Sequence, residues 1–301
     1  MINKIIKGIK TPKLIILRIL QFGIFRFIPD KFFLKIKYRI IIGKKLNLKN
    51  PQSFNEKLQW LKLYDRNPLY TKLVDKYEVR AFIAETIGEE YLIPLYGLYK
   101  SFEEINFDEL PNQFVLKPTH TSGDVYICRD KSQIDFSKLK KLVNYWLKRE
   151  YYWNHREWPY KNITPRIICE KFMIDDESSE LMDYKFLSFN GDIKCLFICL
   201  NRNSPYGLNV DFYDMNWNLM PFERHYKCSG KKISKPKNFD KMVKFSEILS
   251  KNLTFIRVDF YEVNGKLYFG ELTFYPGSGY EEFTPESYDY QLGSWMELKL
   301  N

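Results

Sequence analysis

The chain has 301 residues, of which 45% are apolar and 17% aromatic, so it is no disordered protein and can form one composite domain or two small ones. Its net charge of +10 arises at one end: residues 1–50 hold 13 Lys and Arg against one acid, Asp30, leaving 34 basic and 36 acidic residues elsewhere. This distribution excludes a uniformly basic protein and indicates a near-neutral body with a basic arm.

The first 45 residues alternate short apolar runs with lysine or arginine. No uncharged run approaches the ~18–20 residues of a spanning helix, and Arg18 and Arg26 interrupt the apolar core that a signal peptide needs. The pattern predicts a basic amphipathic helix, which either lies on an anionic membrane surface or packs its apolar face on the body. Nucleic-acid binding is a third option, but the aromatic residues follow no base-reading pattern.

Two helices are predicted next. Ser53 and Glu56 form a capping box that opens a helix through about residue 63. Its apolar face consists of Phe54, Leu58 and Leu61. A second helix is predicted from about residue 71 to 86, with Gly88 as its C′ residue, and a strand over residues 91–99 follows.

Residues 113–130 are the first stretch that suggests chemistry. An apolar strand ends at Lys117-Pro118, and a turn of small residues from Thr119 to Gly123 leads into another strand. The free N–H groups of such a turn and one ammonium group can together hold a phosphate. The stretch lacks the Walker pattern, and a plain hairpin loop is the commoner explanation, so both interpretations stay open.

The remaining elements alternate between helices and hairpins. A helix over residues 135–149 is predicted to face inward through Phe136, Leu139, Leu142, Val143 and Trp146. The other predicted elements are a strand at 166–173, a hairpin at 182–200 turning at Asn190-Gly191, a strand pair over about 209–221, and a helix at 239–252. The alternation, without an internal repeat, predicts an α+β architecture with antiparallel sheets.

A last hairpin, over residues 256–279, carries two acids. Asp259 and Glu271 are roughly equidistant from the turn at Asn264-Gly265, so a two-residue loop brings them to nearly facing positions. Close carboxylates repel and are costly to bury unpaired, and a hard divalent cation such as Mg²⁺ is one solution. The alternative is that both acids are solvated or pair with Arg257 and Lys266.

Cysteine and histidine usage excludes other site types. The five cysteines include no Cys-x-x-Cys pair, and most lie in apolar strand-like runs. We therefore expect buried free thiols in a reducing compartment, with neither a disulfide framework nor a zinc site. The three histidines show no metal-ligand spacing.

The order of these elements over about residues 47–300 resembles the ATP-grasp superfamily, specifically its TupA-like branch. That branch is associated with bacterial capsule, teichuronopeptide and other surface-polysaccharide gene sets. The tail Thr273-Phe-Tyr-Pro-Gly-Ser-Gly279 is typical of the branch and not of the superfamily at large.

Four stretches carry the resemblance to the superfamily. Lys76, after Asp75, resembles the first ATP-grasp lysine, and Lys117 with the loop at 120–124 resembles the second lysine and the phosphate-covering loop. Residues 169–173 resemble the hinge whose backbone binds adenine, and Asp259 with Glu271 resembles the pair of Mg²⁺ ligands. Lys185 occupies a position that often holds a phosphate-contacting basic residue.

The resemblance implies an ATP-grasp fold, in which two α+β subdomains with antiparallel sheets clasp ATP, preceded here by the basic amphipathic helical arm. It divides the chain into the arm (1–50), an N-terminal subdomain (51–112) and the ATP-grasp part (113–301). Within the last part, residues 113–173 form the lid and hinge and residues 174–301 the metal-binding, catalytic part. A cytoplasmic location is implied, with the arm available for peripheral contact with the inner face of the bacterial membrane.

The resemblance also assigns site residues, with ATP and Mg²⁺ or Mn²⁺ as cofactors. The implied catalytic residues are Arg257, Lys117 and Lys185, and the implied metal ligands are Asp259, Glu271 and Thr273. The implied ATP-binding residues are Lys76, Lys117, Ser122, Gly123, Glu170, Lys171, Phe172, Met173 and Lys185.

The implied activity is that of a carboxylate–amine ligase acting through an acyl phosphate, with an amine and a carboxylate-bearing sugar or glycan as substrates and no nucleic-acid partner. Two alternatives stay open. A glycosyltransferase is the first, although the chain has no Asp-x-Asp metal motif. A nucleotide-binding partner without activity is the second, because Thr273 replaces the usual asparagine and the phosphate loop has a single glycine.

Overall fold

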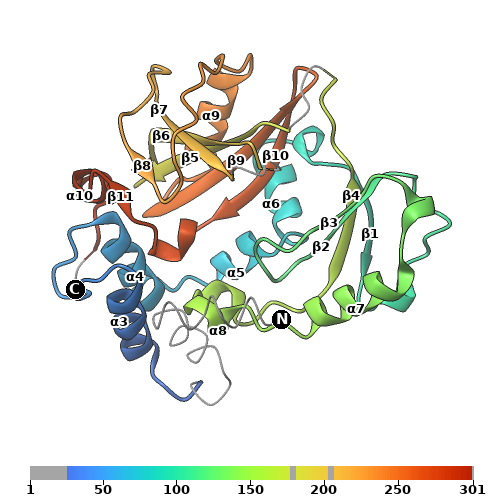
Figure 1. Ribbon diagram of the computed structural model, residues 1–301, viewed down its shortest axis with the longest axis horizontal. Coiled ribbons are helices and arrows are strands. Elements are labelled where there is room, and N and C mark those ends of the chain that lie inside the picture. Colours follow the sequence, from blue (N-terminus) through green and yellow to red (C-terminus); the bar gives the residue numbers. More distant parts are fainter. Residues whose placement is uncertain (1–25, 177–180, 203–206, 300–301) are drawn as a thin grey trace.

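The computed structural model describes residues 26–176, 181–202 and 207–299. Two antiparallel sheets dominate it, one of five strands in the order β10-β9-β5-β6-β7 and one of four in the order β1-β4-β2-β3. Figure 1 shows the large sheet with the C-terminal part of the chain and the small sheet at the opposite side, with α5 and α6 between them. The expected α+β architecture with antiparallel sheets is confirmed.

The elements have the following bounds. The helices are α3 (Asp30–Ile41), α4 (Phe54–Tyr64), α5 (Leu69–Val74), α6 (Val79–Thr86), α7 (Phe136–Leu147), α8 (Tyr152–His155), α9 (Phe239–Leu249) and α10 (Ser287–Ser294). The strands are β1 (Leu95–Tyr99), β2 (Phe114–Pro118), β3 (Tyr126–Cys128), β4 (Ile167–Lys171), β5 (Asp183–Phe189), β6 (Asp192–Leu200), β7 (Asn209–Asp214), β8 (Glu223–Arg224), β9 (Phe255–Val263), β10 (Lys266–Thr273) and β11 (Phe283–Thr284).

One face of the large sheet is covered by α9. Phe186 of β5 and Phe260 of β9 lie in aromatic contact with Phe239 and Phe245 of that helix. Because successive side chains of a strand point to opposite faces, the alternate residues Lys185 and Asp259, which pair across the β5–β9 ladder, point away from α9. The polar face is therefore fixed by the packing of the apolar one.

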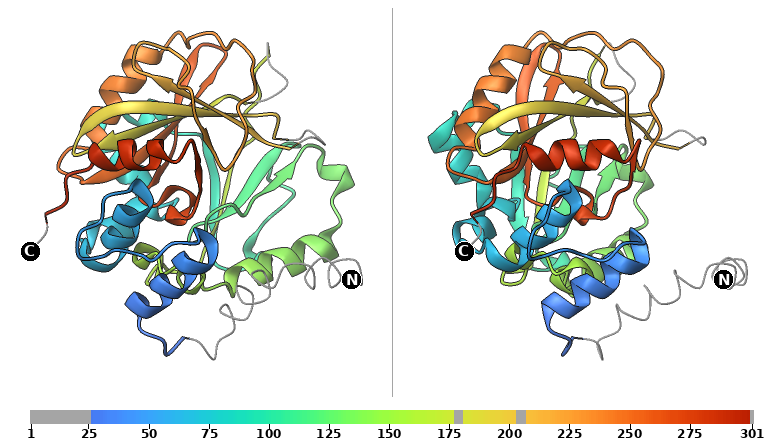
Figure 2. Two further views of the ribbon diagram at one scale, coloured as in Figure 1. Left: turned by 60° about the vertical axis from the view of Figure 1, so that its left-hand side comes forward. Right: turned by 90° about the vertical axis from the view of Figure 1, so that its left-hand side faces the viewer.

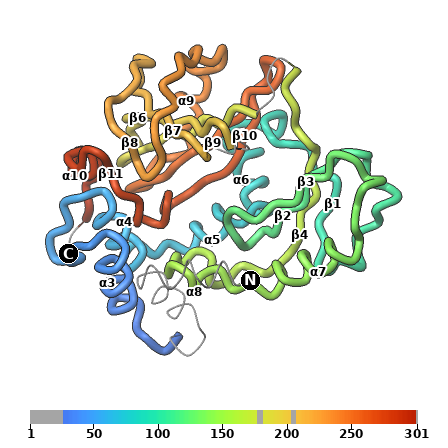
Figure 3. The backbone as a smooth tube through the Cα atoms, viewed as in Figure 1, coloured from blue at the N-terminus to red at the C-terminus, as the bar shows by residue number. Residues whose placement is uncertain are grey.

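The small sheet repeats this arrangement. Its covered face joins Phe114 and Leu116 of β2 and Ile167 of β4 to Val143 and Trp146 of α7 in a separate hydrophobic core. The alternate residues of β2 and β4 consequently face the other way. In the tube of Figure 3, β4 runs between β1 and β2 in this sheet.

Both predicted tight turns of the large sheet are confirmed. Asn190 and Gly191 join β5 to β6, Asn264 and Gly265 join β9 to β10, and all four residues have positive φ. A two-residue turn of this kind needs a left-handed conformation at both positions, which Asn and Gly adopt readily.

Helix α4 packs against α10, and α3 packs on α4, below the large sheet in the views of Figure 2. The capping box of α4 is confirmed, with Ser53 and Glu56 bonding reciprocally, and its Phe54, Leu58 and Leu61 are buried. Helix α3 lies in the predicted arm, yet its Phe33 and Leu34 are fully buried. The arm's first 25 residues lie outside the described part.

The predicted helix over 71–86 is wrong in one respect, because it is broken into α5 and α6. The Asp75 carboxylate accepts hydrogen bonds from the N–H groups of Tyr77 and Glu78, which replaces helical pairing there with a local turn. Gly88 does occupy the C′ position of α6, after the C-cap Ile87.

Other differences are smaller. Phe136 was expected to face inward but is 45% exposed, because it is the first residue of α7 and lies at the rim of that helix. Only β7 forms in the predicted strand pair over 209–221, with a single bridge from Tyr213 to Leu219. The cysteines are free, as expected. Within the described ranges, no helix combines the length and apolarity needed to cross a membrane.

Candidate active site

A cleft of about 530 Å³ lies between the uncovered faces of the two sheets. The small sheet contributes Val115 and Lys117 of β2 and Ile168 and Glu170 of β4, which are the alternate residues pointing away from α7. Of the residues that the sequence assigned, the cleft is lined by Lys76, Lys117, Ser122, Gly123, Glu170, Lys171, Phe172, Met173, Lys185 and Glu271. The structure thus brings together residues from the whole span 76–271.

Two lysines enter the cleft from the small-sheet side. The Lys117 ammonium lies 2.8 Å from the Glu170 carboxylate, which also lies 3.4 Å from the Arg80 guanidinium. The Lys76 ammonium donates to the Thr121 carbonyl, and its backbone N–H donates to the Thr119 carbonyl at 3.3 Å. Lys76 is therefore tied to the 119–123 loop, and burial lowers the pKa of its ammonium group.

The residues assigned to the hinge, 169–173, are the last three residues of β4 and the two that follow it. Lys171 donates its backbone N–H to the Pro94 carbonyl at 2.9 Å, so this N–H is not available to a ligand. Phe172 packs against the Arg129 guanidinium at 5.1 Å, a cation–π contact that joins the end of β4 to the residue after β3. Backbone groups of Phe172 and Met173 remain the candidates for contacts to an adenine ring.

A charged cluster closes the other wall of the cleft. Arg257 donates to both oxygens of Asp259 at 2.7 Å and to Glu271 at 2.5 Å. Lys185 contacts Asp259 on one side and Asp183 at 2.6 Å on the other. The cluster is buried except at Glu271, whose side chain is 37% exposed.

A β-bulge brings Glu271 into this cluster. The β9–β10 register runs regularly from the turn to the pair Phe260–Phe269, then shifts by one residue before Val258–Leu272. The extra residue lets Glu271 lie on the face of Arg257 and Asp259, where a regular ladder would turn it away. At Gly270 a Cβ would lie 3.1 Å from the Asp259 carbonyl oxygen, so the bulge leaves little room for a side chain there.

The two predicted metal-binding acids differ in their electrostatics. Burial would raise the pKa of Glu271, but Arg257, Lys185 and Lys76 outweigh it and lower the pKa to about 2, so the carboxylate is ionised near neutral pH. Burial raises the pKa of Asp259, and Arg257 and Lys185 only partly offset that effect.

The residues fit a hard divalent cation in their chemistry. All three predicted metal ligands would bind through oxygen, from the carboxylates of Asp259 and Glu271 and the hydroxyl of Thr273. The Thr273 hydroxyl lies 3.2 Å from the Glu271 carboxylate. Across the described ranges no group of three His, Cys, Asp or Glu side chains forms a metal-binding cluster. A cation here would rest on two carboxylates, the number that Mg²⁺ uses when a bound phosphate completes its coordination.

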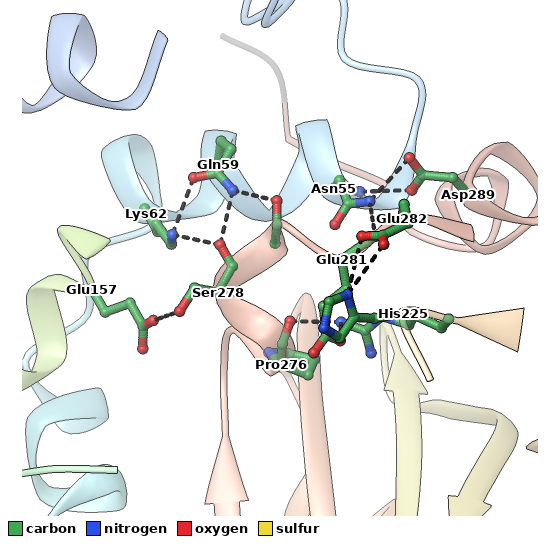
Figure 4. Close-up of polar contacts among 12 residues, drawn as sticks. Asn55, Gln59, Lys62, Glu157, His225, Pro276, Ser278, Glu281, Glu282 and Asp289 are labelled. Atoms are coloured by element: carbon green, nitrogen blue, oxygen red, sulfur yellow. Dashed lines mark hydrogen bonds and ion pairs between the residues drawn. The ribbon is translucent and has the colours of Figure 1, made fainter. Parts of the chain in front are cut away.

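The turn Pro276–Gly279 lies beside the charged cluster and is held in place by hydrogen bonds with side chains of α4 and with Glu157. Gln59 and Lys62 of α4 donate to the Ser278 carbonyl at 2.9 and 2.8 Å, and the Ser278 hydroxyl donates to Glu157. Figure 4 shows these side chains converging on the turn. The Ser278 N–H is used within the turn, by the Tyr275 carbonyl at 2.8 Å.

Sequence reasoning missed two arginines near this site. Arg202 pairs with Asp183 at 2.6 Å, and the buried Arg224 donates to the Pro276 carbonyl at 2.7 Å. Arg224 lies on a two-residue strand and Arg202 follows a strand end, so no local pattern marked either.

Comparisons with known proteins identify relatives of the chain. The profile of the family described as TupA-like ATPgrasp matches residues 56–297. No curated protein matches the chain.

Solved structures of related fold are distant. A D-alanine–D-alanine ligase from Bacillus anthracis, complexed with ATP, is 17% identical over 67% of this chain and 55% of its own, with a TM-score of 0.42. The Helicobacter pylori D-alanine–D-alanine ligase is 12% identical over 77% and 65%, with the same TM-score. The ATP-grasp ligase PsnB, complexed with a precursor variant, Mg and ADP, is 10% identical over 73% and 57%, at 0.41. The chain thus spans less than two thirds of the length of each.

Proposed function

The chain belongs to the TupA-like ATP-grasp family, and from that premise we propose that it is an ATP- and Mg²⁺-dependent carboxylate–amine ligase. The observation that carries the proposal is that Lys76, Lys117, Lys185 and Glu271 line one and the same cleft. Three cations and an ionised carboxylate from four separate elements suit a polyphosphate with a bound divalent cation.

The proposed ligase reaction has two steps, formation of an acyl phosphate and its displacement by an amine. In the first, a carboxylate oxygen of the acceptor bonds to the γ-phosphorus of ATP while the bond from that phosphorus to the β–γ bridging oxygen breaks, releasing ADP. In the second, the amine nitrogen attacks the acyl carbon, the C–O bond to phosphate breaks, and the amine loses a proton to water. Such reactions depend mainly on positioning and on neutralising charge.

The chain's residues have distinct parts in this scheme. Lys76 and Lys117 would neutralise phosphate charge from the lid side, and Lys185 from the large sheet. Arg257 would hold the acceptor carboxylate or the acyl phosphate, for which its planar fork is suited. Asp259, Glu271 and Thr273 would hold Mg²⁺, which supplies charge stabilisation on phosphate oxygens when bound.

The nucleotide site is tested by calorimetric titration of ATP, with and without Mg²⁺, onto the wild type and Lys117→Ala. We expect Mg²⁺-dependent binding that Lys117→Ala weakens, because this ammonium points into the cleft. In an assay of ADP release, Lys117→Ala should also slow the reaction, by the equivalent of about 2–4 kcal/mol of transition-state stabilisation, as for other preorganised charge donors. Lys138→Ala is the matched control, since that lysine lies on α7 of the same subdomain with its side chain 85% exposed.

The outcomes separate the open alternatives. Mg²⁺-dependent ATP binding together with ADP release on addition of a carboxylate and hydroxylamine, a general amine nucleophile, would support the ligase. Binding without ADP release for any carboxylate would favour a partner that has kept the fold and lost activity. Absence of ATP binding under all conditions would rule out the ligase and direct attention to sugar nucleotides.

The proposal extends to substrate class and place in the cell. The family's association with surface polysaccharides suggests an amino acid or amine joined to a uronic-acid-containing glycan or its precursor. On helix α3, Phe32 and Ile36 are exposed, next to the exposed Lys31, Lys35 and Arg39. This face supports peripheral contact with an anionic membrane surface on the cytoplasmic side.

A further inference from the structure

A second cavity, of about 200 Å³, lies on the same face of the large sheet as the 530 Å³ cleft, which we call the ATP cleft after its proposed ligand. Its floor includes Phe197 of β6 and Phe212 of β7, which pair in one row with Lys185 of β5. Lys185 and Arg202 line both cavities, so the two are contiguous. We call the smaller one the side pocket.

The side pocket has an unusual set of charges. Lys185, Arg202, Arg224 and Arg257 line it against a single acid, Glu281, which pairs with Arg224 at 3.0 Å. The acids that pair with the other three cations are elsewhere: Asp183 and Glu271 line the ATP cleft, and Asp259 is buried. The paired cluster thus lies between the two cavities, and its cationic members line both the side pocket and the border with the ATP cleft.

Arg224 has hydrogen-bonding capacity left over. Its side chain is 2% exposed, held by the Pro276 carbonyl and Glu281, and stacked near Phe54 and Phe283. Its Nε nevertheless has no hydrogen-bond partner. A buried donor without a partner costs free energy, and a ligand anion in the adjoining pocket would satisfy it.

The rest of the lining is apolar or aromatic. Leu208, Val210 and Tyr226 complete the wall around the two phenylalanines. Such a surface accommodates a sugar ring or short carbon skeleton, while the guanidinium groups select its charge. The volume is below the ~300–1,000 Å³ common for ligand pockets, which excludes a polymer segment and suits one monosaccharide or amino acid.

We propose that the side pocket binds the carboxylate substrate, a small anionic molecule whose reacting carboxylate lies among Arg224, Arg257 and Lys185, at the border with the ATP cleft. This rests on the proposed function and adds to it a location, a size and a charge for the acceptor. Arg202 and Arg224 become specificity-determining residues that select an acid over its neutral counterpart.

The test titrates matched pairs of small molecules onto the full chain saturated with ADP and Mg²⁺. The pairs are D-glucuronate with D-glucose, and L-glutamate with L-glutamine, so that each acid is compared with a neutral molecule of similar size. We expect one acid to bind at least tenfold more tightly than its neutral counterpart. Arg224→Gln should weaken that binding at least tenfold and leave the Kd for ATP within twofold, because Arg224 does not line the ATP cleft.

A second variant keeps the test decisive if Arg224→Gln, which changes a buried residue, fails to fold. Leu208 is a half-buried residue of the pocket wall, so Leu208→Trp should fill the pocket without removing a charge and should also weaken acid binding at least tenfold. Arg39→Gln, an exposed arginine on α3, is the matched control and should change nothing. Thermal unfolding of each variant establishes that it is folded.

The outcomes distinguish this inference from the function on which it rests. Unchanged acid binding in folded Arg224→Gln and Leu208→Trp overturns the side pocket as the acceptor site. A wild type that binds ATP and neither acid overturns it as well, while leaving the nucleotide site intact. Arg224-dependent acid binding by a chain that does not bind ATP supports the pocket and removes the ligase proposal.

Discussion

At the scale of single residues, burial decides what each charge can do. Lys62 is fully buried on α4, where its ammonium donates to the Ser278 carbonyl at 2.8 Å and to the His155 carbonyl at 3.1 Å. Lys37 of α3 approaches the same place, with its ammonium 3.1 Å from the His155 Nδ1. Burial lowers the pKa of both lysines. These groups join α3, α4 and α8 behind the turn that borders the site.

His155 makes the stability of this region depend on pH. Burial, and then Lys37, Lys62 and Arg149, hold its pKa well below the usual 6.5. Below about pH 6.5 the unfolded chain therefore binds a proton that the folded chain does not, so stability is complete above that pH and falls as the pH drops. We expect urea midpoints between pH 7.5 and 5.5 to fall more steeply for the wild type than for His155→Phe. Parallel slopes would contradict this assignment.

At the scale of elements, irregularities in regular structure build the site. The bulge in β10 places Glu271 beside Arg257, and the break between α5 and α6 brings Lys76 to the 119–123 loop. The turn Pro276–Gly279 includes three residues with positive φ, one of them the non-glycine Ser278. Such backbone persists because surrounding groups determine it, here α4 and Arg224.

Gly279 should be the most sensitive position of this turn. Its φ is +64°, and a Cβ there would lie 2.9 Å from the Leu58 Cβ and 2.6 Å from the Gln59 Nε2. Gly265, in the β9–β10 turn, has a similar φ of +73° but open space around it. We expect Gly265→Ala to lower the free energy of unfolding by about 1–2 kcal/mol, and Gly279→Ala by about 1–3 kcal/mol more.

Urea denaturation of the two glycine variants measures this difference. Both substitutions meet the same left-handed backbone, so only the contact with α4 separates them. Equal losses of stability would mean that α4 yields to the added methyl group and does not hold the turn in place.

At the scale of the whole molecule, the two sheets each turn one face toward the shared cleft. Helix α3, away from that cleft, has a buried side and a solvent-exposed side. Its inner side buries Phe33 and Leu34, and its outer side leaves Phe32 60% and Ile36 43% exposed. The described part of the basic arm therefore packs on the body, and contact of its apolar, basic outer face with a membrane stays a prediction.

Vesicle binding tests the outer face of α3. Full-length protein should co-sediment with vesicles containing phosphatidylglycerol and much less with pure phosphatidylcholine, and high salt should weaken the binding because it screens the lysines. The double variant Phe32→Ser, Ile36→Ser should bind less, while its ATP affinity and thermal stability stay unchanged, since both side chains face solvent. Equal binding of the variant would place any lipid contact away from α3.

Local patterns were sufficient for much of the fold. The Asn-Gly turns, the α4 capping box and the alternation of apolar residues depend on interactions within a few positions, and the structure has them as predicted. The family was also identifiable, because short motifs at Lys117, Asp259 and Glu271 keep their order along the chain.

Long-range packing decided what those patterns could not. The side on which Lys185, Arg257 and Asp259 gather was set by which face α9 covers, and Arg202 and Arg224 joined them through contacts between residues far apart in sequence. A sequence records the period of a strand but not which of its two faces is covered. The sequence by itself determined most of the elements, their order and a set of candidate nucleotide-binding residues. Only the tertiary structure decided that a basic side pocket adjoins the cleft, because such a pocket consists of contacts that no local pattern encodes.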